Sequence, residues 1–394
     1  MVIPQDMPRL LYIVTHPMTA RYLLCGQLAW MQKNGFDVSL ISSPGPDLDV
    51  TAERERVAVF PLPIEREIHP LKDLWTLLRL YRLIRQIRPD MVNASTPKAG
   101  LLGMVAARIA RVPLRIYTLR GLRLETKKGF ARAILHFTEK VASVCATQII
   151  CVSESLRQRY LSLGIIPASK IRVLGAGSSN GVDVLRFASQ ESSAQKESLK
   201  QTLGIPPSAP VIGFVGRLVH DKGIEELVDA FESLRKEFPA VHLLVLGDFE
   251  KGDPVSAHFA AKLNEMGQIV RTGFVPDTAP YYGLMDLLVF PSHREGFPNV
   301  PLEASCSAIP TVGFRVTGTV DAVQDGVTGT LVNCGDVTAF TKAISMYLSD
   351  ERLRREHGRA AYERVCAVFA RERVWQGLRE LYEQSLVKAT ALTV

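Results

Sequence analysis

The sequence predicts an α/β protein built from two doubly wound domains, with a ligand-binding cleft between them. Three observations support this prediction. The chain of 394 residues is too long for a single ordinary core. Short apolar runs alternate with longer segments of helical period in both halves, which is typical of parallel sheets covered on both faces. A polar and then Pro-rich stretch at 186–209 separates the halves and predicts the domain boundary.

The first half contains seven runs that are short, apolar and rich in β-forming residues. We expect strands at 10–15, 38–42, 57–62, 91–95, 114–119, 148–153 and 171–175. Segments of helical period lie between them, including 71–88 and 99–111. Helix 71–88 is rich in Arg and Leu, and we expect it to pack on the core with its cations solvated.

The second half repeats the same alternation. We expect strands at 210–218, 241–248, 269–275, 287–292, 310–316 and 327–333. The expected helices cover 223–237, 256–266, 278–284, 299–307, 337–348, 351–366 and 370–386. No short repeat of solenoid period is present, which favours globular domains.

Cysteine usage and hydropathy indicate the compartment. Six cysteines are scattered without a CxxC pair, so we expect buried thiols in a reducing environment, with neither a disulfide framework nor a metal site. The N-terminal residues lack a charged region followed by a long apolar one. No window of about 18 apolar residues is present either. These features predict a cytoplasmic protein.

Charge is divided unevenly along the chain. Residues 1–185 carry 25 Lys and Arg against 14 Asp and Glu, whereas the whole chain has a net charge of +7. A basic first half predicts an anionic partner, either nucleic acid or a phospholipid surface. Nucleic acid is disfavoured because aromatic residues make up only 7% and no basic stripe with interleaved aromatics is present.

Segment 121–137 is the candidate for the phospholipid surface. It interleaves cations with apolar side chains: Arg123, Lys127, Lys128 and Arg132 with Leu122, Leu124, Phe130, Ile134 and Phe137. Such a loop and helix is expected to lie on an anionic membrane. An ordinary amphipathic helix with a solvated face is the alternative.

Residues 291–305, PSHREGFPNVPLEAS, contain acidic and turn-forming residues that are unsuited to a hydrophobic core. Glu295 and Glu303 flank a Gly/Pro turn directly after a strand. The free N–H groups of a helix starting near Asn299 favour an anion such as a diphosphate. Glu303, one turn further on, is suited to accept hydrogen bonds from vicinal hydroxyls, and Glu295 to hold a sugar hydroxyl. Taken singly, each is equally explained as a surface or helix glutamate.

Three other loops follow strands of the second half and combine with this stretch. Arg217 and Lys222 bracket GRLVHDKG (216–223) and offer two cations to phosphate oxygens. Phe274 and Val275 lie in TGFV (272–275), whose backbone is placed to meet the edge of a base. The turn with Thr317 and Gly318, before a helix, gives backbone N–H groups access to phosphate oxygens.

REGFPNVPLEAS resembles the E-x7-E signature of the retaining family 4 glycosyltransferases, which have the GT-B architecture of two facing Rossmann-like domains. The resemblance also includes GRLVHDKG, GTVDAVQDGVTGTLV (318–332), STPKAGLLG (95–103) and LGAGSSNGVD (174–183). It is greatest with the bacterial transferases that build capsular polysaccharides, exopolysaccharides and lipid-linked glycans.

The resemblance implies a role for each matching residue. Glu303 binds the ribose of a nucleotide-sugar donor, and a UDP-hexose such as UDP-glucose is favoured. The proposed catalytic residues are Glu295, which positions the donor sugar, and Arg217 and Lys222, which neutralise the diphosphate. The backbone N–H groups around Asn299 and Val300 assist the cations. The side chains of Phe297 and Pro298, which precede the helix, shape the sugar pocket. No metal ion and no cofactor besides the donor are implied.

The resemblance also implies the domain boundaries and the class of acceptor. The last helix crosses back, so we expect an acceptor-binding domain of 1–185 with 370–394 and a donor-binding domain of 205–369. The acceptor is a glycan or lipid-linked saccharide, met by His16, Lys98, Arg120 and Asn180. The chain departs from many relatives in two places: THPMTAR (15–21) replaces a Gly-Gly loop, and Arg120 replaces a histidine. A nucleotide-sugar epimerase of the same architecture and a non-catalytic nucleotide-binding module are the alternatives.

Overall fold

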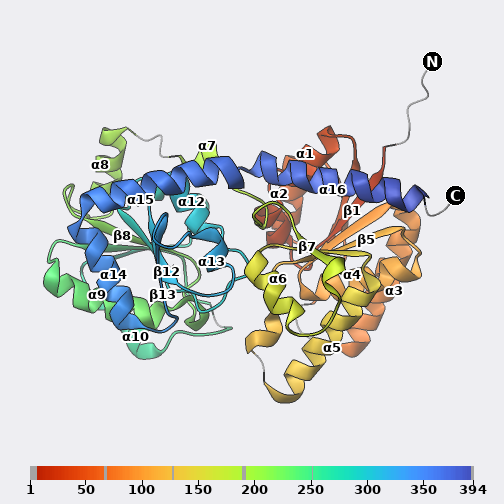
Figure 1. Cartoon of the computed structure of the whole chain (residues 1–394), viewed down its shortest axis with the longest axis horizontal. Helices are drawn as coiled ribbons and strands as arrows, with labels where there is room; N and C mark the ends of the chain where they lie inside the picture. Colours follow the sequence, from red (N-terminus) through yellow and green to blue (C-terminus); the bar gives the residue numbers. More distant parts are fainter. Residues whose placement is uncertain (1–6, 66–68, 127, 189–191, 251, 392–394) are drawn as a thin grey trace. The chain divides into compact units, whose positions relative to one another are not determined.

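The computed structural model describes residues 7–65, 69–126, 128–188, 192–250 and 252–391. The chain divides into two compact units (Figure 1). The first comprises Met1–Asn180 together with Glu372–Val394, and the second Gly181–Arg371. Each unit is a parallel sheet with helices on both faces, as the alternation of apolar and helical segments predicts.

The first unit is built on a seven-stranded parallel sheet of order β3-β2-β1-β4-β5-β6-β7. Its strands are β1 (Arg9–Ile13), β2 (Asp37–Ser42), β3 (Ala58–Pro61), β4 (Met91–Ser95), β5 (Leu114–Leu119), β6 (Gln148–Cys151) and β7 (Ile171–Val173). All seven were expected from sequence, with ends that differ by at most two residues. Most of their residues are apolar and buried, because helices cover both faces of the sheet.

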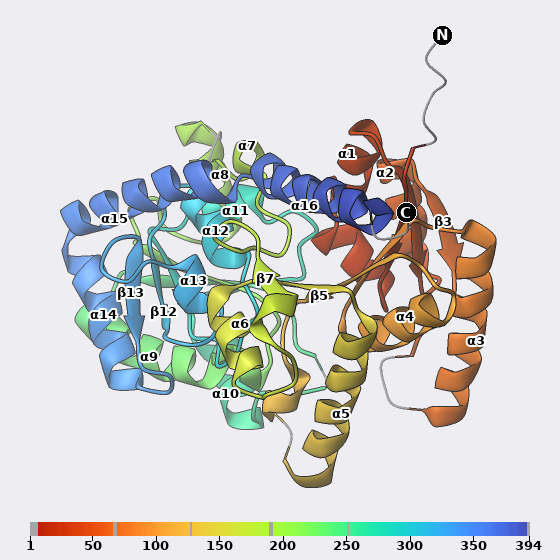
Figure 2. The same cartoon turned by 45° about the vertical axis from the view of Figure 1, so that its right-hand side comes forward.

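Helices cover the two faces of this sheet in separate groups (Figure 2). One group is α3 (Pro70–Ile87), α4 (Pro97–Ile109) and α5 (Gly129–Cys145), which pack side by side. The other is α1 (Gln27–Lys33), α2 (Pro46–Glu55) and α16 (Arg371–Ala391). Shorter elements complete the unit: the π-helical turn η1 (Thr19–Leu23), the 3-10 turns η2 (Arg123–Thr126) and η3 (Ala168–Lys170), and α6 (Glu154–Leu161).

The last helix, α16, belongs to the first unit through buried aromatic side chains. Trp375 is 3% exposed and donates a hydrogen bond from Nε1 to Oδ1 of Asn180 at 2.7 Å. Tyr382 is fully buried, and its hydroxyl accepts a hydrogen bond from Asn93 at 2.6 Å. Because these groups are buried and paired, separating α16 from the sheet would strand polar atoms in an apolar core.

The second unit is built on a six-stranded parallel sheet of order β10-β9-β8-β11-β12-β13. Its strands are β8 (Val211–Val215), β9 (His242–Leu246), β10 (Ile269–Gly273), β11 (Leu287–Phe290), β12 (Thr311–Phe314) and β13 (Gly329–Val332). The core on one face is filled by α9 (Ile224–Glu237), α10 (Ala257–Glu265) and α14 (Val337–Ser349). On the other side α12 (Val300–Cys306) packs against α7 (Val184–Phe187), α11 (Ala279–Tyr282) and α15 (Glu351–Arg364). The remaining elements are α8 (Ser193–Thr202), η4 (His220–Lys222), α13 (Thr319–Ala322) and η5 (Val365–Phe369).

Two sequence-based expectations need correction. The boundary falls at Asn180/Gly181 rather than after 185, because α7 packs into the second unit, where the Phe187 ring lies 5.8 Å from that of Tyr282. The stretch at 186–209 therefore belongs to the second unit. All six cysteines are free, but Cys334 is exposed rather than buried.

Candidate functional site

The candidate site of the second unit lies where its strand order reverses, between β8 and β11. The loops that follow these two strands are 216–223 and 291–299. Gly223 brings them together: it has φ +68°, and a Cβ on it would lie 2.0 Å from the carbonyl oxygen of Pro291. Only glycine tolerates both the left-handed backbone and this contact. Ligands of open α/β sheets bind at such a reversal of strand order.

Lys222 and Glu295 form an ion pair across these two loops. Both side chains are largely buried, with 19% and 13% of their surface exposed. We expected Lys222 to meet a diphosphate and Glu295 a sugar hydroxyl. In the structure the two charges neutralise each other in a partly desolvated position, where an ion pair is stronger than at the surface.

A second layer of ion pairs holds the loop after β11 in place. Nε2 of His293 lies 2.7 Å from Oε1 of Glu226. Arg294 donates a hydrogen bond to the carboxylate of Asp221 at 2.7 Å. The hydrogen bond that the His293 ring donates to the Glu226 carboxylate raises the pKa of His293. The sequence analysis missed these contacts, although the complementary charges of HDK (220–222) and HRE (293–295) are a signal for them.

Glu303, on α12, is held by a tyrosine that the sequence analysis also missed. The hydroxyl of Tyr282 donates a hydrogen bond to Oε2 of Glu303 at 2.7 Å. Burial raises the pKa of Glu303, and the hydrogen bond from Tyr282 lowers it in part. Among the described residues no other donor bonds this carboxylate, so Oε1 remains available to a ligand hydroxyl. No spacing in the sequence signals Tyr282.

The loop after β12 closes against the same turn. Gly318 has φ +78°, and a Cβ on it would lie 2.5 Å from the carbonyl oxygen of Gly296. Three buried polar atoms around these loops have no hydrogen-bond partner within the described chain: Ser292 Oγ, Asn299 Oδ1 and Thr319 Oγ1. Because buried polar atoms are normally paired, their grouping at one edge of the sheet indicates a ligand-binding surface.

The other predicted donor-site residues have different surroundings. Arg217 is 60% exposed and pairs with Glu250. Phe274 is 62% exposed at the end of the edge strand β10, with Val275 beside it half-buried.

The side chain of Phe297 is buried within the second unit. It is 5% exposed and packs 5.4 Å from the ring of Phe369. Pro298 is also buried, whereas Val300 and Thr317 are half-buried.

The predicted acceptor residues in the first unit fall into two groups. His16 and Lys98 follow β1 and β4, where the strand order of the first sheet reverses. Lys98 pairs there with Asp73 at 2.7 Å, and Thr96 holds φ +74°, an uncommon value for a residue other than glycine. Asn180 differs: it is 6% exposed, and its amide bonds Trp375 and the carbonyl of Cys25 at 3.1 Å. Asn180 therefore anchors the last helix, which is a structural role.

The described residues contain no group of three or more His, Cys, Asp and Glu side chains that is placed to hold a metal ion. The site brings together the paired lysine and glutamate, a second buried carboxylate and the backbone N–H groups of converging loops.

Two Rossmann-like units, with this set of residues at the reversal of strand order in the second, define a glycosyltransferase of the GT-B fold. Residues 195–364 match the model of glycosyl transferases group 1, and residues 20–177 match the glycosyl transferase 4-like domain. The chain belongs to glycosyltransferase family 4.

Curated relatives and solved structures agree with this assignment. The capsular polysaccharide biosynthesis glycosyltransferase CapM of Staphylococcus aureus is 37% identical over 92% of this chain and 94% of its own length. An Escherichia coli UDP-Gal:alpha-D-GlcNAc-diphosphoundecaprenol alpha-1,3-galactosyltransferase is 28% identical over 81% of each chain. Among solved structures, Anabaena HepE in complex with UDP superposes with a TM-score of 0.80 at 21% identity, covering 96% of this chain and 100% of that one.

The contact between Gly223 and Pro291 is open to a direct test of stability. Gly223→Ala is expected to lower the free energy of unfolding of the second unit by more than about 2 kcal/mol, because left-handed strain and a backbone clash add. Gly326→Ala is the matched control, since Gly326 has φ +72° but nothing within 4 Å of its Cβ position. Gly326→Ala should lower the free energy of unfolding by about 1 kcal/mol. Denaturant unfolding measures both values, and equal losses would contradict the close contact.

Proposed function

We propose that the protein is a retaining hexosyltransferase that moves a hexose from a UDP-sugar to a lipid-linked acceptor in bacterial surface-polysaccharide synthesis. The observation that carries this proposal is the Lys222–Glu295 pair beside the buried carboxylate of Glu303. A cation, a sugar-directed carboxylate and a ribose-directed carboxylate are the groups that a nucleotide diphosphate sugar requires.

The donor is bound by exchange of partners at this pair. The diphosphate takes over the Nζ of Lys222, and Glu295 is released to accept hydrogen bonds from hydroxyls of the donor sugar. Glu303 accepts from the ribose hydroxyls through Oε1. Arg217 is exposed and flexible enough to turn from Glu250 to the phosphate oxygens.

Transfer breaks the bond between the anomeric carbon and the phosphate oxygen and forms a bond to an acceptor oxygen. Lys222 and Arg217 stabilise the negative charge that develops on the leaving nucleotide. With Glu295 assigned to positioning, we propose a front-face route through an oxocarbenium-like state. The leaving phosphate oxygen then accepts the proton of the acceptor hydroxyl. The chain's own cations supply the charge that the reaction needs, so we propose that transfer is independent of a metal ion.

The acceptor proposal is supported by the relatives. CapM is named for capsular polysaccharide biosynthesis, and the E. coli relative for transfer to a diphosphoundecaprenol-linked sugar. We propose an acceptor of this class, a saccharide on a lipid diphosphate, for the present chain. Such a substrate would place the enzyme at the cytoplasmic face of a membrane.

Calorimetric titration with UDP, GDP and ADP tests the donor site. UDP is expected to bind with micromolar affinity. Glu303→Ala should weaken binding at least tenfold because a carboxylate–hydroxyl hydrogen bond is worth about 1.5–3 kcal/mol. Glu265→Ala, at an exposed glutamate on α10, is the matched control and should leave the affinity unchanged.

Two outcomes would contradict the proposal. One is the absence of binding by any nucleotide, and the other is UDP binding that is indifferent to Glu303→Ala. With a UDP-hexose and acceptor, the same preparation should yield a product that keeps the donor's anomeric configuration. A free epimerised nucleotide-sugar would instead favour the epimerase alternative.

Helix α3 supplies the surface that we propose for the membrane. Its exposed face contains Leu71, Leu74, Trp75 and Leu78, which are 45–85% exposed and recur at helical spacing. The helix packs on the core through Leu80 and Ile84, with its cations exposed, as expected, and this apolar face is an additional feature. The exposed side chains of this helix also include four cations: Lys72, Arg79, Arg82 and Arg85.

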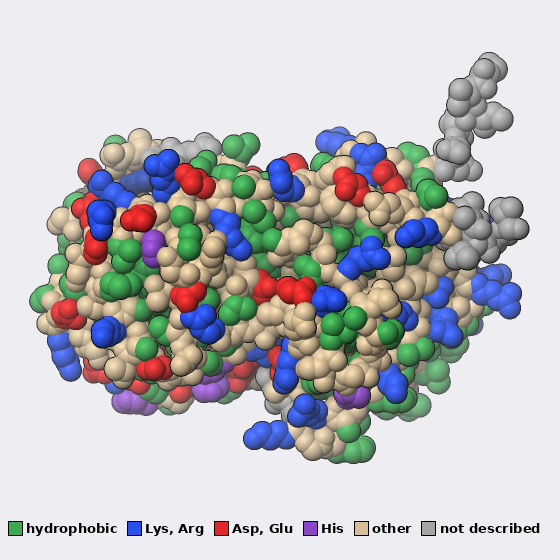
Figure 3. All heavy atoms as spheres, viewed as in Figure 1, with side chains coloured by type: hydrophobic (Ala, Val, Ile, Leu, Met, Phe, Trp, Pro, Cys, Tyr) green, Lys and Arg blue, Asp and Glu red, His purple; other side chains and the backbone are tan. Residues whose placement is uncertain are grey.

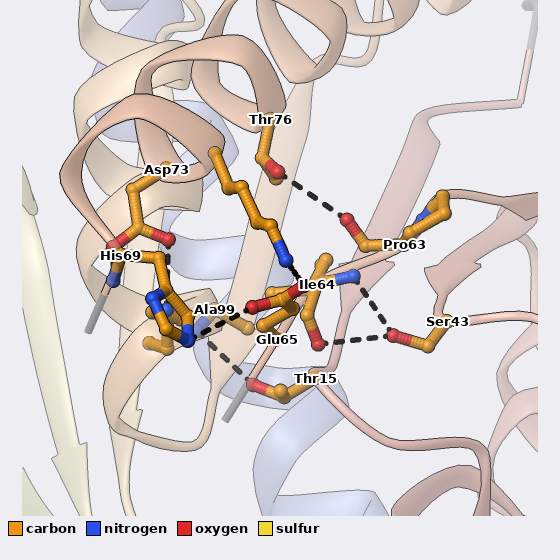
Figure 4. A network of polar contacts seen from close by, with 11 residues as sticks. Thr15, Ser43, Pro63, Ile64, Glu65, His69, Asp73, Thr76 and Ala99 are labelled. Atoms are coloured by element: carbon orange, nitrogen blue, oxygen red, sulfur yellow. Dashed lines mark hydrogen bonds and ion pairs between the residues drawn. The ribbon is translucent and has the colours of Figure 1, made fainter. Parts of the chain in front are cut away.

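The apolar side chains of α3 lie on a well-braced helix start. Figure 4 shows two of the contacts: Thr76 donates to the carbonyl of Pro63 at 3.3 Å, and the Ser43 hydroxyl accepts from the N–H of Ile64 at 2.9 Å. In addition, Lys72 pairs with Glu65 at 2.6 Å. The side chain of Trp75 is fixed further by the guanidinium of Arg79, 3.6 Å from its ring. A tryptophan beside cations is suited to the interface between lipid headgroups and acyl chains.

Helix α5 adds to this surface from the same face of the sheet. Phe130 and Phe137 are 82% and 65% exposed, and Lys128 and Arg132 are exposed beside them. Figure 3 shows blue cationic and green apolar side chains gathered over this part of the first unit, with few red acidic ones. Leu122 and Leu124, which we expected in this surface, are buried.

The expected surface includes two cations on which the structure gives no information. Lys127 and the side chain of Arg123 lie outside the described residues. Across the described chain, no helix combines the length and hydropathy needed to cross a bilayer. The proposed contact is accordingly peripheral, with apolar side chains inserted at the level of the headgroups and cations on anionic lipid.

Vesicle sedimentation tests the α3 surface. The double variant Leu71→Glu, Trp75→Glu should bind vesicles containing anionic lipid at least tenfold more weakly, because it removes apolar area and adds two negative charges. Leu185→Glu is the matched control, since Leu185 is 78% exposed in the second unit. Equal binding by the wild type and the double variant would contradict the proposal, as would equal binding to neutral and anionic vesicles.

A further inference from the structure

The first unit contains a buried arginine with no counter-charge. Arg120 directly follows β5, and its Nη1 donates a hydrogen bond to the carbonyl oxygen of Ser179 at 2.9 Å. Its Nε is buried and has no partner, while the residue as a whole keeps some exposed surface. Among the residues that the structure describes, no carboxylate pairs with this guanidinium.

The groups around Arg120 do not supply the missing negative charge. Burial lowers its pKa to about 10, so it still carries its proton at neutral pH. Burial also raises the pKa of Tyr12, and that of Tyr382 to about 12, so both neighbouring hydroxyls are neutral. A charge held away from water without a partner is costly, and this arrangement is typical of a site that a ligand completes.

Arg120 lines a small cavity under the ends of β4, β5 and β6. The cavity is formed by Gln27, Asn93, Thr118, Arg120, Ser178 and Ser179 on its polar side. Its volume is about 40 Å³, room for about three waters. A phosphate or carboxylate group fits this space, whereas a sugar ring does not.

The other polar side chains that line the cavity are uncharged. Thr118 donates to Oδ1 of Asn93 at 2.8 Å, and the Asn93 amide donates to Tyr382 at 2.6 Å. These side chains satisfy one another, so they bring no charge of their own. The planar guanidinium, with its Nε buried and unpartnered, offers the N–H fork that matches two oxygens of one anion.

We infer that the Arg120 cavity is a binding site for one oxyanion group of a substrate. This inference rests on the proposed function, which supplies the substrate that carries the oxyanion. The group is either a phosphate of the lipid diphosphate acceptor or the carboxylate of an acidic sugar. The site therefore predicts that this enzyme requires an anionic substrate group here.

Anion titration of the full chain tests this inference. The double variant Arg217→Ala, Lys222→Ala serves as background because it removes both cations of the proposed donor site. Pyrophosphate and glucuronate are titrated calorimetrically at constant ionic strength. Arg120→Gln in this background should weaken the tighter-binding anion at least tenfold. Arg120→Lys keeps the charge but loses the fork of N–H donors. Its affinity for that anion should lie between those of the background variant and of Arg120→Gln. Thermal unfolding of each variant verifies that it is folded.

The two anions distinguish the sources. Tighter pyrophosphate binding supports the site and assigns it to the acceptor phosphate. Tighter glucuronate binding supports it and assigns it to a carboxylate-bearing sugar. Unchanged binding by folded Arg120→Gln, or no binding of either anion, would overturn the inference. UDP titration of the wild type reports on the donor site separately, so failure of the proposed function is visible independently.

Discussion

The donor side of this enzyme depends on one ion pair, between Lys222 and Glu295. The pair joins the loops that follow two adjacent strands, β8 and β11, at the point where the strand order reverses. It exists because Gly223 lets one loop press against Pro291 of the other. A partly buried lysine and glutamate that neutralise each other are stable without a ligand, yet both are suited to a nucleotide-sugar.

The ion pair has a physical consequence for catalysis. In the function that we propose, a diphosphate competes with Glu295 for Lys222, so binding of the nucleotide and release of the carboxylate are one event. The contacts of His293 with Glu226 and of Arg294 with Asp221 would keep the loop in place during this exchange. The proposed cations then reach the leaving group when the donor binds, before the chemical step.

The first unit has a different character. Its α3 and α5 expose apolar and cationic side chains together, and Arg120 holds a charge without a counter-charge in a small cavity. Both features cost stability in an isolated molecule. Both are accounted for if the substrate is anionic and is presented at a lipid surface.

The sequence predicted most of the fold and several of the residues that meet at the reversal of strand order in the second unit. Apolar strands and helical periods located every strand of both sheets, because parallel sheets covered on both faces leave a strong pattern. The E-x7-E stretch and the two loop cations are local in sequence, so their proximity follows from strand order.

Other features were not predictable because they depend on tertiary packing. The bond from Tyr282 to Glu303 and the burial of Phe297 against Phe369 have no spacing that signals them. The exposed apolar face of α3 was not predicted, because periodicity identifies apolar positions without showing what covers each of them. Arg120 was noted only as a departure from relatives, since the absence of a counter-charge is visible only in three dimensions.

A double-mutant cycle on UDP affinity tests the exchange at Lys222 and Glu295 most directly. Lys222→Met should weaken UDP binding at least tenfold. Glu295→Gln should strengthen it several-fold, because UDP has no hexose for Glu295 to hold and the lysine is released from its partner. In the Lys222→Met background, Glu295→Gln should have no effect. Weaker UDP binding by Glu295→Gln alone would contradict competition between the carboxylate and the diphosphate for the same lysine.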